Sequence, residues 1–198
     1  MIFFILGLPL LGGGLAFMLP KNGLRNGVLF CVSFVHLLCV VSFWISPPPE
    51  ILSGFLALDR LGLLVLSVTS TLFFVVSVYA VGYFHGASGE SNRILIGCLL
   101  CFLFSMTLTA VSQHFGLFWV AIEATTLASA PLINQQRTRQ GLEATWKYLM
   151  ICSVGIALAL LGTFFLATSV IGFRTLLLRD LLNHATGFSV PWLKLSVI

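Results

Sequence analysis

Six long runs of apolar residues account for most of this 198-residue sequence. A helix needs roughly 20 apolar residues to cross a hydrocarbon core about 30 Å thick, because it rises 1.5 Å per residue. Backbone groups inside the hydrocarbon must be hydrogen-bonded within the segment, so helices are expected for these runs. The six predicted spans are residues 2–19, 27–46, 61–84, 94–113, 117–134 and 142–170. The sequence therefore predicts an all-α polytopic membrane protein with a single membrane domain over residues 1–198.

Charged residues are too few to cover a water-soluble surface. Lys, Arg, Asp and Glu make up 8% of the chain, against the ~25% that is usual in soluble domains. The net charge of +4 is spread thinly along the chain instead of forming a basic patch, which argues against nucleic-acid binding. The partner predicted for this surface is the lipid bilayer.

Two shorter elements are predicted after the sixth span. Residues 173–183 place Arg174, Arg179 and Asp180 among leucines, a pattern typical of a short helix lying in the membrane interface. Residues 191–198 are the start of a seventh apolar helix, and eight residues cover only ~12 Å. We expect this helix to be completed either by a longer polypeptide or by a partner chain.

Basic residues in the loops predict the orientation. The loops after spans 1, 3 and 5 hold more of them than the loops on the other side, so by the positive-inside rule they face the cytoplasm and the N-terminus lies outside. The first set is Lys21, Arg25, Arg93, Arg137 and Arg139, and the second set is Arg60, Arg174 and Arg179.

Glu123 is the first candidate for a functional residue, because it is the acid that lies near mid-depth in a predicted span. An acid at the centre of a spanning helix costs roughly 2.5–3.5 kcal/mol on insertion scales, so it should face the protein interior with a partner or a proton. Both conditions suit a proton carrier. The alternative is a structural acid that is hydrogen-bonded to a neighbouring helix.

Lys147 is the predicted partner of Glu123, one to two turns into the sixth span. Counting from the helix ends predicts an axial offset of roughly 8 Å between the two residues, which a stretched lysine or bridging waters can close. Two alternatives remain open for Lys147. Its ammonium group reaches the headgroups, or it forms a local ion pair with Glu143, four residues earlier on the same helix face.

His36 is an isolated titratable residue in the second span. Histidine titrates near neutral pH, so His36 is a candidate for proton transfer, and a buried histidine with satisfied hydrogen bonds is the alternative. We predict no catalytic residue, metal site or bound cofactor in this chain. Cys98 and Cys101 have C-x-x-C spacing but no second ligand pair, and they lie in an apolar helix.

The sequence around Glu123 and Lys147 resembles the antiporter-like membrane subunits of complex I and of membrane-bound hydrogenases. Residues 116–129 (GLFWVAIEATTLAS) resemble the family's fifth helix with its glutamate, and residues 142–149 (LEATWKYL) followed by CSVG resemble the sixth helix with its lysine. Residues 57–59 (ALD) and 78–84 (VYAVGYF) are most similar to the F-type branch of the hydrogenase 4 membrane subunits. The resemblance covers the chain as the N-terminal portion of such a protein.

The resemblance implies a proton-translocating subunit in a prokaryotic cytoplasmic (inner) membrane, with Glu123 in the role of the glutamate and Lys147 in that of the sixth-helix lysine. The family's seventh-helix lysine would lie beyond Ile198. The partners implied are other membrane subunits, one of which supplies the seventh helix onward, and peripheral iron-sulfur and hydrogenase or dehydrogenase subunits. Redox cofactors are expected in those partners and not in this chain.

Three function hypotheses follow from these observations. The leading one is a proton-translocating subunit that couples electron transfer in partner subunits to proton movement through Glu123 and Lys147. The second is a subunit of a multisubunit cation/proton antiporter, in which an ion gradient drives the exchange. The third is a structural membrane subunit that does not conduct.

Overall fold

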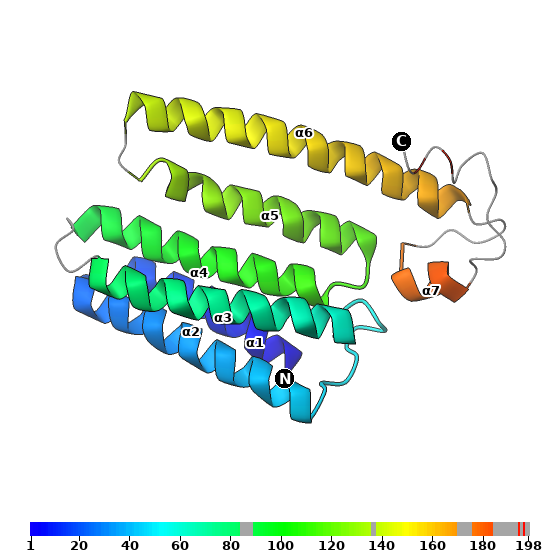
Figure 1. Ribbon diagram of the computed structural model, residues 1–198, viewed down its shortest axis with the longest axis horizontal. Helices are drawn as coiled ribbons and strands as arrows, with labels where there is room; N and C mark the ends of the chain where they lie inside the picture. The colour runs from blue at the N-terminus through cyan, green and yellow to red at the C-terminus, as the bar shows by residue number, and fades with distance from the viewer. Residues whose placement is uncertain (84–88, 136–137, 170–175, 184–193, 195, 197–198) are drawn as a thin grey trace.

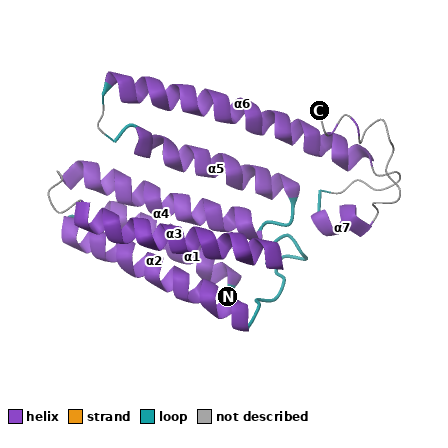
Figure 2. Cartoon of the chain, in the orientation of Figure 1, coloured by secondary structure: helices purple, strands orange, loops and turns teal. Residues whose placement is uncertain are grey.

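The computed structural model describes residues 1–83, 89–135, 138–169, 176–183, 194 and 196, and these residues form helices and no strands (Figures 1 and 2). The long helices run side by side, and each is antiparallel to the next along the chain (Figure 1). The elements are α1 (Ile2–Met18), α2 (Asn22–Ile45), α3 (Arg60–Tyr83), α4 (Gly89–Val111), α5 (Phe115–Ile133), α6 (Arg139–Ser169) and α7 (Leu178–Asn183). The predicted all-α polytopic membrane fold is confirmed.

Five of these helices, α2 to α6, are long and apolar enough to cross a membrane. The first helix, α1, is a shorter apolar helix of 17 residues. At 1.5 Å per residue α1 is about 25 Å long, which is at the lower end of the length needed for a span. Each of the six helices overlaps one of the apolar runs of the sequence.

Two helices begin well before their predicted starts, because polar residues in their first turns have hydrogen-bond partners within the protein. Helix α2 begins at Asn22, whereas the prediction placed its start at residue 27. The guanidinium of Arg25, only 5% exposed, donates from Nε to the Leu19 carbonyl at 2.7 Å and from Nη1 to Asn22 Oδ1 at 3.0 Å. Helix α4 begins at Gly89, and its buried Asn92 contacts α2.

The predicted interfacial helix is shorter than expected. Helix α7 covers Leu178–Asn183, while residues 173–175 lie outside the described residues. Leu176 and Leu177 are not helical, because this segment pairs with the turn between α4 and α5. Phe115 N–H donates to the Leu176 carbonyl and Leu178 N–H to the Gln113 carbonyl, both at 2.9 Å. Of the predicted partial helix 191–198, only Lys194 and Ser196 are described, and both are helical.

Helix α4 lies at the centre of the bundle, packed against α1, α2, α3 and α5. Its Ile96, Leu100 and Leu103 are fully buried and form the main apolar core with residues of α1, α2 and α3. Helix α6 lies at the edge of the bundle and packs on α5 (Figure 1). Most apolar side chains of α6 therefore face outward, as Trp146 and Ile151 do.

Candidate functional site

The candidate site lies in the α5–α6 seam, the line along which these two antiparallel helices meet. Two hydrogen bonds fix the register of this seam. The indole Nε1 of Trp119 donates to the Ile156 carbonyl at 3.0 Å, and the hydroxyls of Ser129 and Tyr148 are 2.9 Å apart. The Ser129 hydroxyl donates its single hydrogen to the Thr126 carbonyl at 2.9 Å, so Tyr148 is the donor to Ser129.

Glu123 lies between these two contacts and faces α6. It is half-buried, and its Oε1 accepts a hydrogen bond of 2.9 Å from the hydroxyl of Ser153. An acid in a spanning helix is expected to face the protein and to have a polar partner. Glu123 has both properties in this structure. The sequence alone does not single out Ser153. The position of Ser153 is the one indication in the sequence, because Glu123 and Ser153 lie at similar distances from the connection between α5 and α6.

Lys147 contacts Glu143 instead of Glu123. Its Nζ lies 2.5 Å from Glu143 Oε1, one turn away on α6, and both side chains are largely exposed. Lys147 precedes Ser153 by six residues, so it is displaced from Glu123 by about 9 Å along the seam. The structure thus brings together Lys147 and Glu143, and separately Glu123 and Ser153, and it does not join the two pairs.

His36 lies away from the seam, in the core between α2, α3 and α4. Its side chain is fully buried, with Nε2 3.0 Å from Thr107 Oγ1 and Nδ1 3.0 Å from Ser70 Oγ. The Thr107 hydroxyl donates its hydrogen to the Leu103 carbonyl at 2.7 Å, so it can only accept from the imidazole. This places the imidazole hydrogen on Nε2 and makes Ser70 the donor to Nδ1.

Two further polar pairs lie in the same core as His36. The hydroxyls of Ser33 and Ser77 are 2.7 Å apart, and the Asn92 amide donates to Asn26 Oδ1 at 3.3 Å. The spacing of Asn26, Ser33 and His36 on α2 puts all three on one helix face. These contacts between helices tie α2 to α3 and α4, and no described contact joins them to Glu123.

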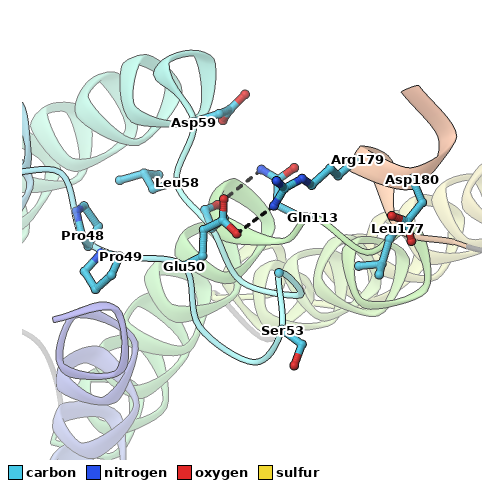
Figure 3. A pocket seen from close by; sticks show the side chains of 12 residues that line it. Pro48, Pro49, Glu50, Ser53, Leu58, Asp59, Gln113, Leu177, Arg179 and Asp180 are labelled. Atoms are coloured by element: carbon cyan, nitrogen blue, oxygen red, sulfur yellow. Dashed lines mark hydrogen bonds and ion pairs between the residues drawn. The ribbon is translucent and has the colours of Figure 1, made fainter. Parts of the chain in front are cut away.

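At one end of the bundle, the loop between α2 and α3 meets the α4–α5 turn and α7 around a cavity of about 560 Å³ (Figure 3). Arg179 of α7 forms an ion pair of 3.3 Å with Glu50 across this cavity. Asp59 also lines it and accepts the Gly62 N–H at 2.8 Å, which is the helix cap that its place before α3 suggests. Among the described residues, no group of three or more His, Cys, Asp or Glu side chains is placed to hold a metal ion.

Comparison with known sequences gives two kinds of relative, and no family model matches the chain. A hydrogenase-4 component F homolog from Methylacidiphilum infernorum is 33% identical over 145 residues, which are 70% of this chain and 29% of that protein. NADH-ubiquinone oxidoreductase chain 2 of Danio rerio is 43% identical over 54 residues, which are 27% of this chain and 16% of that protein. This chain is a relative of the complex I-like membrane subunits.

Solved structures show the same complex I-like fold. A chain of the membrane-bound sulfane sulfur reductase, an archaeal respiratory membrane complex, has a TM-score of 0.83 at 16% identity, and the match covers 99% of this chain and 42% of that one. A chain of respiratory complex I from Thermus thermophilus with bound aureothin has a TM-score of 0.77 at 23% identity, covering 100% of this chain and 41% of that one.

The chain spans less than half the length of each of these complex I-like relatives. This agrees with the expectation that the resemblance concerns a portion of such a subunit. Both solved neighbours belong to multisubunit respiratory membrane complexes.

Proposed function

We propose that this chain is a proton-translocating membrane subunit of a hydrogenase or complex I-like oxidoreductase, and that Glu123 carries the proton. The observation that supports this most directly is the placement of Glu123, which is a half-buried carboxyl group in a spanning helix with a hydroxyl partner on the next helix. Ion pathways and proton relays are the common roles of such acids.

Lys147 supplies the movable positive charge in this proposal. An ammonium group close to Glu123 stabilises the carboxylate, and when the charge moves away the acid takes up a proton. In the structure Lys147 is paired with Glu143, so it must leave this pair to approach Glu123 across the ~9 Å offset. The Glu143 pair is therefore the state in which Lys147 is withdrawn.

For His36 we propose the structural alternative to proton transfer. Its hydrogen-bond chain runs from Ser70 through the imidazole to Thr107 and ends at the Leu103 carbonyl. A backbone carbonyl has no hydrogen to pass on, so this chain does not continue toward the α5–α6 seam. Its effect is to join three helices by one buried side chain.

The proposed setting is a prokaryotic inner membrane with the N-terminus outside. The proposed partners are other membrane subunits, one of which supplies the seventh spanning helix onward, and peripheral iron-sulfur and hydrogenase or dehydrogenase subunits. Electron transfer takes place in those peripheral subunits, and this chain moves the protons.

The test is proton translocation by the whole complex in membrane vesicles, with the variant Glu123→Gln. The amide keeps the shape of the side chain and cannot carry a proton, so we expect translocation to be lost while the complex still assembles. Glu50→Gln is the matched control, because it makes the same change at an exposed glutamate in the loop between α2 and α3, away from the α5–α6 seam, and we expect translocation to continue.

Normal translocation in assembled Glu123→Gln complexes would show that the proposal is wrong and would favour the structural subunit. Sodium-dependent proton movement without any redox substrate, in vesicles where the complex contains membrane subunits only, would instead support the cation/proton antiporter.

A further inference from the structure

The hydroxyl of Ser153 makes a different kind of hydrogen bond from the other serine and threonine hydroxyls of α5 and α6. In a helix, serine and threonine commonly donate to a carbonyl three or four residues earlier. Across the described parts of α5 and α6, every other serine and threonine does this. These residues are Thr125, Thr126, Ser129, Thr145, Thr163, Thr168 and Ser169. Ser153 donates to Glu123 of the other helix instead.

Ser153 can donate only one of these two hydrogen bonds. A serine hydroxyl has a single hydrogen, so the bond to Glu123 replaces the bond to a carbonyl of its own helix. A hydrogen bond that is donated to an ionised carboxylate is roughly twice as strong as one between neutral groups. The hydrogen bond from Ser153 therefore stabilises the charged form of Glu123 more than its protonated form.

The seam holds Ser153 opposite Glu123. The Trp119–Ile156 contact lies about one helical turn along α5 on one side of Glu123, and the Ser129–Tyr148 contact lies on the other side. Sliding one helix past the other would break both contacts. Glu123 therefore meets Ser153 without any shift of the backbone, whereas Lys147 has to extend along the seam to reach it.

We propose that Ser153 is the positioning residue for Glu123. Its hydroxyl holds the Glu123 carboxylate toward α6 after Lys147 has moved to Glu143 and until Glu123 takes up a proton. This inference rests on the function proposed for Glu123. It adds that proton uptake by Glu123 includes the loss or reversal of the Ser153 hydrogen bond, because a protonated carboxyl group donates where the carboxylate accepted.

The test uses the whole complex in vesicles and two measurements, the rate of proton translocation and the infrared band of the Glu123 carboxylate. The band is assigned as the one that is missing in Glu123→Gln. For Ser153→Ala we expect a shifted carboxylate band and translocation slowed roughly tenfold, the effect of losing one hydrogen bond to a charged group. Ser153→Thr keeps the hydroxyl and should restore both.

Ser169→Ala is the matched control, because it removes a hydroxyl from the same helix that donates to its own backbone. We expect the band and the rate to be unchanged in this variant. Ser153→Cys keeps a similar size with a weaker donor and should give an intermediate band, which provides the readout should Ser153→Ala not assemble.

An unchanged carboxylate band in Ser153→Ala or Ser153→Cys would overturn the role of Ser153. If Glu123→Gln nevertheless abolished translocation, the function proposed for Glu123 would stand without a role for Ser153. A shifted band together with normal translocation in Glu123→Gln would support the contact between the two residues and reject the function.

Discussion

Lys147 and Glu143 form an ion pair within α6, with Nζ 2.5 Å from Oε1, although Glu123 is the acid that lies near the middle of its helix. Both members of this pair are exposed, with side-chain exposures of 70% and 64%. The two residues lie one turn apart on the same helix, so Lys147 can leave Glu143 without any movement of the backbone. A local partner of this kind suits a movable charge.

Replacing Lys147 tests whether its charge reaches Glu123. For Lys147→Gln we expect slower proton translocation by an intact complex, because Glu123 then lacks the charge that promotes its deprotonation. Glu143→Gln should also slow translocation, because Lys147 then loses the partner that draws its charge away from Glu123. The rates are measured in vesicles after normalising to the amount of assembled complex. Equal rates in Lys147→Gln and in the unaltered complex would mean that Lys147 takes no part in proton transfer.

The buried hydrogen bonds of His36 predict a stability effect that is separable from proton movement. His36→Ala leaves a cavity and strips Ser70 and Thr107 of their partner, so we expect the free energy of unfolding in mixed micelles to fall by about 2–4 kcal/mol. Translocation per assembled complex should stay close to normal. Ser70→Ala, which removes one hydrogen bond and little volume, should cost about 1 kcal/mol.

Loss of translocation in fully assembled His36→Ala complexes would instead place His36 on a proton path. An unfolding free energy equal to that of the unaltered protein would contradict the hydrogen bonds that link α2, α3 and α4.

The spans could be predicted from the sequence because apolar runs of sufficient length have one stable form in a membrane. Helix ends were less predictable. Arg25 and Asn92 look like loop residues until their hydrogen-bond partners on other segments are known. The shortening of α7 has the same origin, because the pairing of Leu176 with Phe115 depends on segments distant in sequence.

The candidate site could be predicted in part. Glu123 stands out because a carboxyl group is costly in a spanning helix. Ser153 does not stand out, because a serine in a helix is usually bonded to its own backbone, and only the register of the seam reveals its partner. The choice of Lys147 between Glu143 and Glu123 depends on side-chain conformation, and the sequence left both partners open.

Trp119 should contribute to the stability of the α5–α6 seam. Trp119→Phe keeps an aromatic ring and removes the donor to the Ile156 carbonyl, so we expect the free energy of unfolding to fall by about 1 kcal/mol. Trp146→Phe is the matched control, because Trp146 is 62% exposed on the outer face of α6, and it should change the stability much less. Equal effects of the two substitutions would mean that the indole hydrogen bond does not hold the seam.

Gly62 is expected to be intolerant of any side chain. A Cβ at this position would lie 2.7 Å from the Ala110 carbonyl oxygen and 2.6 Å from Asp59 Oδ1, the group that caps α3. The carbonyl belongs to the backbone of α4, so α3 and α4 would have to move apart, and overpacking of this kind typically costs about 1–3 kcal/mol. Gly62→Ala should lower the unfolding free energy by that amount. Gly14→Ala is the control, because a Cβ there meets nothing within 4 Å and alanine favours the helix by up to ~1 kcal/mol. A Gly62→Ala protein as stable as Gly14→Ala would show that α3 and α4 are not in close contact at this point.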